Sequence, residues 1–515
     1  MLDGDLELDD DYRELGNWYG FGYTATGARH NPFGIGPALF WTPGFLVGHA
    51  IEKVWPSERG STYLEGATRA EQGATLFTSF VAALLAFWFA FRWCARYVAE
   101  HWAFAASLLA FFGSPLVWYA LYSPAMPHAL EACLASALLL QVEPPRERSV
   151  KQSAWLGATA GALALVRPQH AVFLAVPALQ VVVELWRGDT ATRWRVVRSF
   201  AVLAGVALLV FSPQLWLWKR MYGSAWVVPQ GSGFLRFGAS LASETLFSSR
   251  NGLFTSTPLL WFVLPGLVLA FRRDRVLGAV LAGLFFTTAF VNGAVWDWWG
   301  GGAFGGRRFL ATYPVWALSL ALLLETLARS RRFRRPGLGL ALGLAFAALA
   351  LQIGVLRAHK AHAFSWETTV PFGERVRIAT GLRLFEGRAS PFSFPANAWF
   401  ALRHGVPASR YDRSVGPYLL DERLPTTNPL LPPKKHDRVS FMEPGSLAFL
   451  GRGFELRSDG AEAAGGQGEL FVPLNRSGRL VARVELTAQA EAPVFRWNGV
   501  VVPTVARSTS FELSV

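Results

Sequence analysis

Three charged stretches of this 515-residue chain carry residue types suited to an acid–base or anion-binding site. The N-terminal stretch holds Asp3, Asp5 and Asp10, and a carboxylate can act as a general base on a hydroxyl group or bind a metal ion. Residues 219–254 hold Arg250, and arginine binds phosphate oxygens through paired hydrogen bonds. The same residue types also occur in solvated charge runs and in anchors for lipid headgroups, so both interpretations stay open.

The third stretch, residues 297–309 (DWWGGGAFGGRRF), combines glycines with aromatic and charged side chains. Glycine allows a backbone to approach a ligand closely, and Trp298 next to Asp297 could stack on a sugar ring. Arg307 and Arg308 could bind a lipid phosphate. The alternative is a tight turn whose tryptophans lie in the interfacial belt of a membrane.

Two further polar positions border apolar segments. His128, in YSPAMPHALE, is followed one turn later by Glu131, and polar groups within a membrane segment are costly and usually functional. Arg167 lies in the short sequence RPQH between two apolar segments. We therefore add His128 and Arg167 to the candidate substrate-binding residues, with packing against neighbouring helices as the alternative.

The cysteines and histidines indicate neither a metal centre nor a disulfide framework. Cys94 and Cys133 form no CxxC pair, and His359 and His362 have no third ligand near them in sequence. We predict no metal ligands, although a requirement for a divalent cation stays open. A net charge of +13 would suggest nucleic acid in a soluble protein. Here the basic residues lie in short connections between apolar segments, which predicts that no nucleic acid is bound.

The elements that must position these residues are long apolar segments. The chain is 52% hydrophobic and only 17% charged, and runs of about 20 apolar residues are long enough to cross a bilayer as helices. This pattern predicts an α-helical polytopic membrane protein with about ten spans. The predicted spans are residues 73–92, 103–121, 124–142, 153–167, 169–186, 197–218, 254–271, 276–295, 309–328 and 337–357. Arg167-Pro168 separates two of them, because proline disfavours helix at the residue before it; one long broken helix is the alternative.

The distribution of basic residues predicts the orientation of the spans. Lysine and arginine are concentrated in alternate connections, within residues 92–96, 146–151, 187–198, 272–275 and 329–335. The positive-inside rule places these connections in the cytoplasm. The regions predicted to lie outside are then residues 1–72, 219–253, 296–308 and everything after 358.

Composition divides the chain into four regions. They are an outer acidic loop (1–72), a transmembrane helical domain (73–357), a linker (358–445) and a small β-rich extracytoplasmic domain (446–515). Within the first region, the proline-interrupted stretch 29–50 predicts a helix that lies in the membrane interface. Within the last, short alternating runs and the hairpin signal Asn498-Gly499 predict a β-sandwich.

The N-terminal region raises a question of membrane insertion. An outer segment of about 70 residues is hard to translocate when no span or signal precedes it. We therefore expect the first span of the protein to lie upstream of Met1, and mapping the N-terminus of the native protein tests this expectation.

A set of stretches between residue 1 and about residue 330 stands in a characteristic order. They are LDGDLELDDDY (2–12), HNPFGIGPALFW (30–41), YSPAMPHALE (122–131), LVRPQ (165–169), FSPQLWLWKRMYG (211–223), LFSSRNGLFTSTPLLW (246–261) and DWWGGGAFGGRRF (297–309). In order and spacing they resemble the GT-C class of integral membrane glycosyltransferases. Within that class the pattern is most similar to bacterial protein O-mannosyltransferases and the aminoarabinose transferase of lipid A.

The resemblance implies a polyprenyl-phosphate-linked sugar as donor and a lipid, glycan or protein as acceptor. Transfer would occur at the outer face of the bacterial inner membrane, with a first-loop carboxylate as base. Outer arginines, foremost Arg307 and Arg308, would stabilise the departing lipid phosphate. In the family the key acid directly follows the first span. Residues 4–8 resemble a later part of that loop, so the catalytic acid is expected upstream of Met1, with Asp3 and Asp5 in supporting roles.

Two other classes of membrane protein compete with this interpretation. An O-antigen polymerase or ligase would also use lipid-linked glycans and outer arginines, and it would show a dominant large outer loop late in the chain. A non-enzymatic transporter of lipid-linked glycans would show paired inverted repeats with broken helices at the bilayer midplane. No convincing repeat is visible in this sequence.

Overall fold

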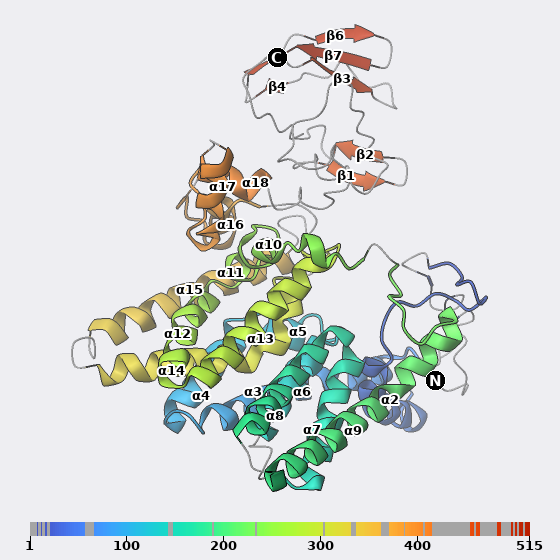
Figure 1. The fold of residues 1–515 in the computed structure, drawn as a ribbon. Coiled ribbons are helices and arrows are strands. Elements are labelled where there is room, and N and C mark those ends of the chain that lie inside the picture. The colour runs from blue at the N-terminus through green and yellow to red at the C-terminus, as the bar shows by residue number, and fades with distance from the viewer. Residues whose placement is uncertain are drawn as a thin grey trace.

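The fold was obtained as a computed structural model of the chain. It describes residues 8, 12, 16–17, 21–56, 66–142, 148–187, 190–231, 234–301, 304–330, 336–361, 370–385, 387–404, 407–414, 454–457, 460–463, 481–485, 496–497, 500–501, 504–507 and 510–514. The described part is mostly helical, with a few short strands near the C-terminus (Figure 1).

Most of the chain up to residue 414 that the structure describes is helical. The α-helices are α2 (Gly36–Val54), α3 (Arg69–Cys94), α4 (Glu100–Phe112), α5 (Leu116–Leu121), α6 (His128–Gln141), α7 (Val150–Val166), α8 (Ala175–Arg187), α9 (Thr190–Tyr222), α10 (Ala242–Phe247), α11 (Leu253–Ser256), α12 (Val263–Arg273), α13 (Arg275–Ala294), α14 (Tyr313–Arg329), α15 (Pro336–Lys360), α16 (Phe372–Thr380), α17 (Ala396–His404) and α18 (Tyr411–Ser414). Tighter 3-10 turns connect them at η2 (Pro168–Leu174), η3 (Phe237–Ala239), η4 (Pro258–Phe262), η5 (Arg307–Thr312), η6 (Pro391–Ser393) and η7 (Ala408–Arg410).

Six helical segments in the described part are long and apolar enough to cross a membrane. They are Arg69–Cys94, Pro168–Trp186, Thr192–Tyr222, Arg275–Ala294, Arg307–Arg329 and Leu342–Lys360. Each coincides with one of the ten predicted spans. The other four predicted spans, residues 103–121, 124–142, 153–167 and 254–271, contain shorter or interrupted helices. The structure thus supports a membrane protein with six candidate spans, fewer than the sequence predicted.

Proline and glycine explain the interruptions. Gly113-Ser114-Pro115 separates α4 from α5, and Pro258 opens the 3-10 turn before α12. The predicted break at Arg167-Pro168 is confirmed, because α7 ends at Val166 and Arg167 has an extended backbone with φ −151° and ψ 117°. A residue before proline is driven into this conformation by the proline ring.

Helix α14 belongs to the most buried of the six candidate spans and packs against α3, α4 and α12. Its side chains Tyr313 and Trp316 are fully buried. Helices in lipid gain little from burial alone, so close packing through small residues matters more. At Gly48 of α2, a Cβ would lie 2.5 Å from the Ala70 carbonyl oxygen of α3, and at Gly161 of α7 a Cβ would lie 2.5 Å from the Ala207 carbonyl oxygen of α9.

The proline-interrupted stretch 29–50 contains most of helix α2, as predicted. Helix α2 packs against α3, and a buried contact of 2.7 Å joins His49 Nδ1 to Glu71 Oε1. Several apolar side chains of α2, including Leu46 and Val47, are exposed. Placement of this helix in the membrane interface stays a prediction.

The C-terminal strands form three small antiparallel sheets. The first pairs β1 (Phe454–Arg457) with β2 (Gly460–Ala463), the second has the order β3 (Val481–Glu485), β7 (Ser510–Ser514), β6 (Thr504–Arg507), and the third pairs β4 (Arg496–Trp497) with β5 (Val500–Val501). In the third sheet Trp497 is opposite Val500, which confirms the predicted hairpin pairing. In Figure 1 the strands lie beyond α16–α18, on the side away from the long helices.

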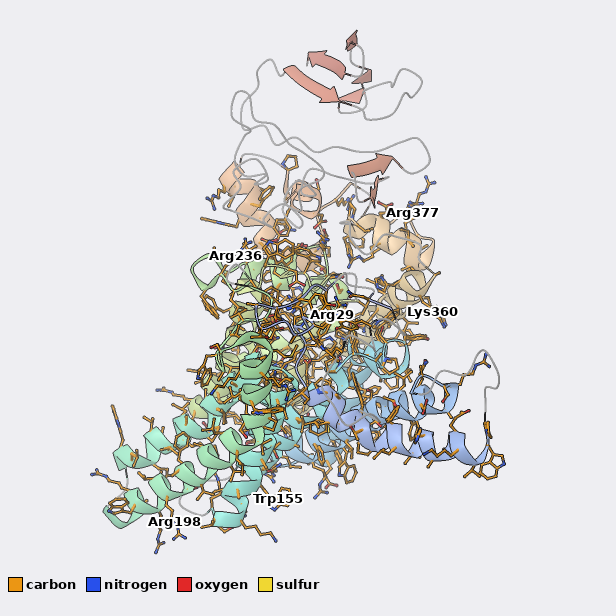
Figure 2. All side chains as sticks on the ribbon, turned by 90° about the vertical axis from the view of Figure 1, so that its right-hand side faces the viewer. Arg29, Trp155, Arg198, Arg236, Lys360 and Arg377 are labelled. Atoms are coloured by element: carbon orange, nitrogen blue, oxygen red, sulfur yellow. The ribbon has the colours of Figure 1, made fainter. Side chains whose placement is uncertain are left out.

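The two ends of the helical bundle carry different predicted loops. Figure 2 shows Arg198 and Trp155 at one end, and Arg236 and Arg377 toward the opposite end. Arg198 of the predicted cytoplasmic connection 187–198 therefore lies at the opposite end from Arg236 and Arg377, which belong to two of the predicted outer regions.

Candidate functional site

The predicted site residues fall into two groups. Asp3, Asp5 and Asp10 lie outside the described residues. The other seven are described. One begins α6, one directly follows α7, one follows α10, and four lie between α13 and α14. The seven are His128, Arg167, Arg250, Asp297, Trp298, Arg307 and Arg308.

Glu131 is the centre of a buried charged cluster. Its Oε1 lies 2.9 Å from Arg167 Nε and 3.1 Å from His128 Nδ1, and its Oε2 lies 3.0 Å from His170 Nε2. Glu131, His128 and His170 are almost completely buried, whereas 23% of the Arg167 side chain is exposed. Arg167 therefore reaches from a buried carboxylate toward the surface of the site.

The local sequence explains this arrangement. His128 and Glu131 are one turn apart on α6 and so share one face of the helix. Helix α7 ends at Val166, and η2 begins at Pro168. A 3.0 Å hydrogen bond from the His170 amide to the Arg167 carbonyl oxygen brings His170 back beside Arg167. The Arg-Pro break thus directs both side chains to the same carboxylate.

Tyr119 and Arg307 adjoin this cluster. The Tyr119 ring contacts the His128 ring edge to face at 4.6 Å, and its hydroxyl donates a 2.9 Å hydrogen bond to the Phe304 carbonyl oxygen. The Arg307 guanidinium is close enough to Tyr119 and Arg167 to interact electrostatically with both. Arg307 therefore adds a second guanidinium to the surroundings of the Arg167–Glu131 ion pair.

Arg307 is poorly satisfied by the protein around it. Its Nη1 lies 3.0 Å from the Met126 sulfur, which is a weak hydrogen-bond acceptor. Its buried Nε has no hydrogen-bond partner among the described residues. A guanidinium with unused donors beside a second one favours an anionic ligand, because an anion would satisfy the donors and screen the repulsion.

Arg308, unlike Arg307, is paired with an acidic residue of the same loop. Its Nη2 lies 2.6 Å from Asp297 Oδ1, and its Nη1 donates a 2.6 Å hydrogen bond to the Asp297 carbonyl oxygen. These two bonds close the loop from Asp297 to Arg308, in which Gly300 and Gly301 have φ values of 80° and 65° that favour glycine. Arg308 and Asp297 therefore stabilise the shape of the loop, and their role in substrate binding stays a prediction.

Arg250 and Asn251 hold the same loop from the other side. The Arg250 guanidinium carbon lies 4.2 Å from the centroid of the Trp299 ring, a cation–π distance. Asn251 Nδ2 donates to the carbonyl oxygens of Trp299, at 3.2 Å, and Gly301, at 3.3 Å.

A small pocket lies between this loop and α13, with a cavity volume of about 10 Å³, roughly the space of one water molecule. It is lined by Thr245, Asn251, Asn292, Trp298, Trp299, Gly300, Gly305, Gly306, Arg307, Arg308 and Phe309. Four buried lining atoms have no hydrogen-bond partner among the described residues, namely Asn292 Nδ2, Trp298 Nε1, Trp299 Nε1 and Arg307 Nε. All four are donors, so the pocket is complementary to a ligand rich in acceptor oxygens.

The described residues contain no group of three or more His, Cys, Asp or Glu side chains placed to hold a metal ion. In the cluster around Glu131, the Arg167 guanidinium forms an ion pair with the carboxylate, and His128 and His170 contact its two oxygens.

Sequence reasoning missed several residues of the site, among them Tyr119, His170, Asn251 and Asn292. Asn292 was visible as a polar residue near the end of an apolar helix, which is a signal of function in a membrane segment. His170 stands three residues after Arg167, a spacing that brings side chains together on a helical turn. The role of Glu131 as the common partner depends on contacts between α6 and η2, which spacing alone does not reveal.

Glu244, near the loop from residue 248 to residue 256, is a buried acid that contacts the Tyr411 side chain. Tyr411 donates a 2.8 Å hydrogen bond to Glu244 Oε2. Burial raises the pKa of the Glu244 carboxyl to about 8, and the hydrogen bond from Tyr411 opposes this rise. Glu244 therefore keeps its proton at neutral pH in the folded protein.

This pKa predicts a pH-dependent stability. Between about pH 4.5 and pH 8 the unfolded chain loses the Glu244 proton while the folded protein keeps it, so stability falls as pH rises, by up to about 1.4 kcal/mol per pH unit. Glu244→Gln is neutral at every pH and still accepts the Tyr411 hydrogen bond. We expect the variant to unfold at a higher temperature than the wild type at pH 8.5, with a smaller difference at pH 5. Thermal unfolding in detergent at the two pH values measures this, and parallel pH profiles would contradict it.

Comparisons of the chain with protein-family models, with curated proteins and with solved structures gave no match.

Proposed function

We propose that this protein is a membrane glycosyltransferase of the GT-C class, which moves a sugar from a polyprenyl-phosphate donor to a lipid, glycan or protein acceptor. The observation that carries the proposal is the electrostatic interaction between the guanidinium groups of Arg167 and Arg307, of which Arg307 has an Nε without a hydrogen-bond partner among the described residues. A polyprenyl phosphate supplies the anion that such a pair favours, and its lipid tail suits a protein with six candidate spans.

The unpartnered donors beside Arg307 support a sugar as the group attached to that phosphate. Sugars offer many acceptor oxygens and apolar ring faces, which suit the indole N–H groups and rings of Trp298 and Trp299. Asn292 adds an amide donor to the same surface. In this proposal the phosphate lies between Arg167 and Arg307, and part of the sugar faces the pocket.

The reaction requires one bond exchange. The acceptor hydroxyl oxygen attacks the anomeric carbon of the sugar, the bond from this carbon to the phosphate oxygen breaks, and the hydroxyl proton passes to a carboxylate base. The lipid phosphate leaves as an anion, and Arg307 and Arg167 stabilise the charge that develops on it. Carboxylates of the first loop, with Asp3, Asp5 and Asp10 among them, are the proposed source of the base.

The proposal extends to location and architecture. The site is proposed to face the outside of a bacterial inner membrane, together with the C-terminal strands, which are proposed to complete a β-sandwich. In Figure 2, Arg198 and Arg236 lie at opposite ends of the helical bundle, which is consistent with this topology.

The proposal is tested with the native full-length protein reconstituted into vesicles. The assay supplies polyprenyl phosphates that carry radiolabelled sugars, together with membrane extract as acceptor, and follows the label and the released polyprenyl phosphate. Transfer of the label with release of an equal amount of polyprenyl phosphate is the expected result. Movement of the intact labelled donor across the bilayer, without release of polyprenyl phosphate, would indicate a transporter and not an enzyme. Joining of whole glycan chains would instead indicate a polymerase or ligase.

A further inference from the structure

The helices that follow the last candidate span pack on the turn that carries Arg250 and Asn251. Helix α16 contributes Arg375, which is buried. Arg375 Nη1 donates a 3.2 Å hydrogen bond to the Thr255 carbonyl oxygen, and Nη2 donates to the Ser249 carbonyl oxygen. One guanidinium therefore joins both ends of the turn on which Arg250 and Asn251 stand.

Asp412, at the start of α18, contacts the same turn. Its carbonyl oxygen accepts a 2.5 Å hydrogen bond from Ser249 Oγ, and its carboxylate accepts hydrogen bonds from the Ser390 amide at 3.3 Å and Ser393 Oγ at 3.2 Å. Burial lowers the pKa of Arg375 to about 10, an effect that Asp412 opposes, so Arg375 stays cationic at neutral pH. The segment predicted as a linker thus brings a buried charge to the turn.

The turn itself reaches the pocket. Arg250 lies over the Trp299 ring, and Asn251 donates to two carbonyl oxygens of the pocket loop. Asn251 has a φ of 56°, which is uncommon for a residue other than glycine and persists where surrounding contacts hold it. The path from Arg375 to the pocket consists entirely of direct contacts.

We propose that Arg375 is a positioning residue for the pocket, which fixes the turn from residue 248 to residue 256 so that Arg250 and Asn251 hold the Trp299 loop in its binding shape. Arg375 does not line the pocket, and its effect passes through the turn. The structural part of this inference is independent of the reaction, and only its activity readout rests on the proposed function.

The test compares Arg375→Ala with Arg377→Ala. Arg377 stands on the same helix, is labelled in Figure 2, and has 46% of its side chain exposed, so it is a matched control for the same substitution. Hydrogen exchange is followed in segments 248–256 and 299–301 and, as a reference, in the central helix α14. We expect exchange in both loop segments to become about tenfold faster in Arg375→Ala, with α14 unchanged and with wild-type behaviour in Arg377→Ala.

The activity readout is the KM for the polyprenyl-phosphate sugar. A misplaced loop weakens binding, so Arg375→Ala should raise this KM about tenfold and change kcat less, and Arg375→Lys should restore part of the loss. If the wild type transfers no sugar, the proposed function fails and the exchange comparison still decides the inference. Unchanged exchange in 299–301, or equal acceleration in the loops and in α14, would overturn it. If Arg375→Ala does not fold, Arg375→Lys takes its place and must accelerate exchange at 299–301 selectively.

Discussion

Replacing Arg307 with alanine is expected to reduce sugar transfer by about 100-fold or more. The side chain offers an unused Nε and a weakly used Nη1 next to Arg167, where the leaving phosphate is placed. Removal of one donor that stabilises charge in a transition state typically costs about 100- to 1000-fold in rate. Arg307→Lys keeps the charge but loses the planar pair of donors, so it should retain an intermediate activity. The rate of polyprenyl phosphate release in reconstituted vesicles measures the effect.

Two further arginine variants separate this role from a general effect of charge. Arg272→Ala removes an exposed arginine at the end of α12 and should leave transfer unchanged. Arg308→Ala breaks the ion pair with Asp297 and should disturb the loop, with loss of activity accompanied by lower thermal stability. Sugar transfer at the wild-type rate by a folded Arg307→Ala protein would contradict the proposed contact between Arg307 and the phosphate.

Replacing Glu131 with glutamine is expected to destabilise the protein by about 3–5 kcal/mol. The substitution leaves Arg167 and the two histidines beside a neutral group in a buried site, and breaking a buried ion pair from one side usually costs this much. Thermal or chemical unfolding in detergent measures the loss. Glu100→Gln is the matched control, because Glu100 is exposed in the first turn of α4 and its loss should cost less than about 1 kcal/mol.

A second substitution shows whether the loss at Glu131 comes from the unpaired charge. The double variant Glu131→Gln with Arg167→Gln removes both partners, so its destabilisation should be smaller than the sum of the two single effects. Additive losses would mean that the 2.9 Å contact between these side chains contributes little to stability.

The sequence predicted the positions of the helices better than their continuity. All ten apolar segments are helical, because apolar composition over about 20 residues strongly favours helix in a membrane protein. Glycine and proline within 103–121 and 254–271 divide those segments, and their effect was predicted only at Arg167-Pro168.

The candidate site was predicted in part. Residue chemistry pointed to His128, Arg167 and Arg307, which the structure brings together. It could not separate Arg307 from Arg308, because adjacent residues differ only in the partners that folding provides. Asp297 forms an ion pair with Arg308, whereas the Arg307 guanidinium contacts the Met126 sulfur. The position of Arg375 beside the turn at 249–255 depends on contacts between segments more than 100 residues apart, which no local pattern encodes.

The central claim is that Arg167 and Arg307 bind the phosphate of a polyprenyl lipid. The most direct measurement is the Kd of polyprenyl phosphate for the native protein in detergent, compared with the Kd of the matching polyprenol. The account predicts that the phosphate binds at least about tenfold more tightly than the alcohol, and that Arg307→Ala and Arg167→Ala each remove this preference while Arg272→Ala keeps it. Equal affinities of the wild type for phosphate and alcohol, or an unchanged preference in Arg307→Ala, would contradict it.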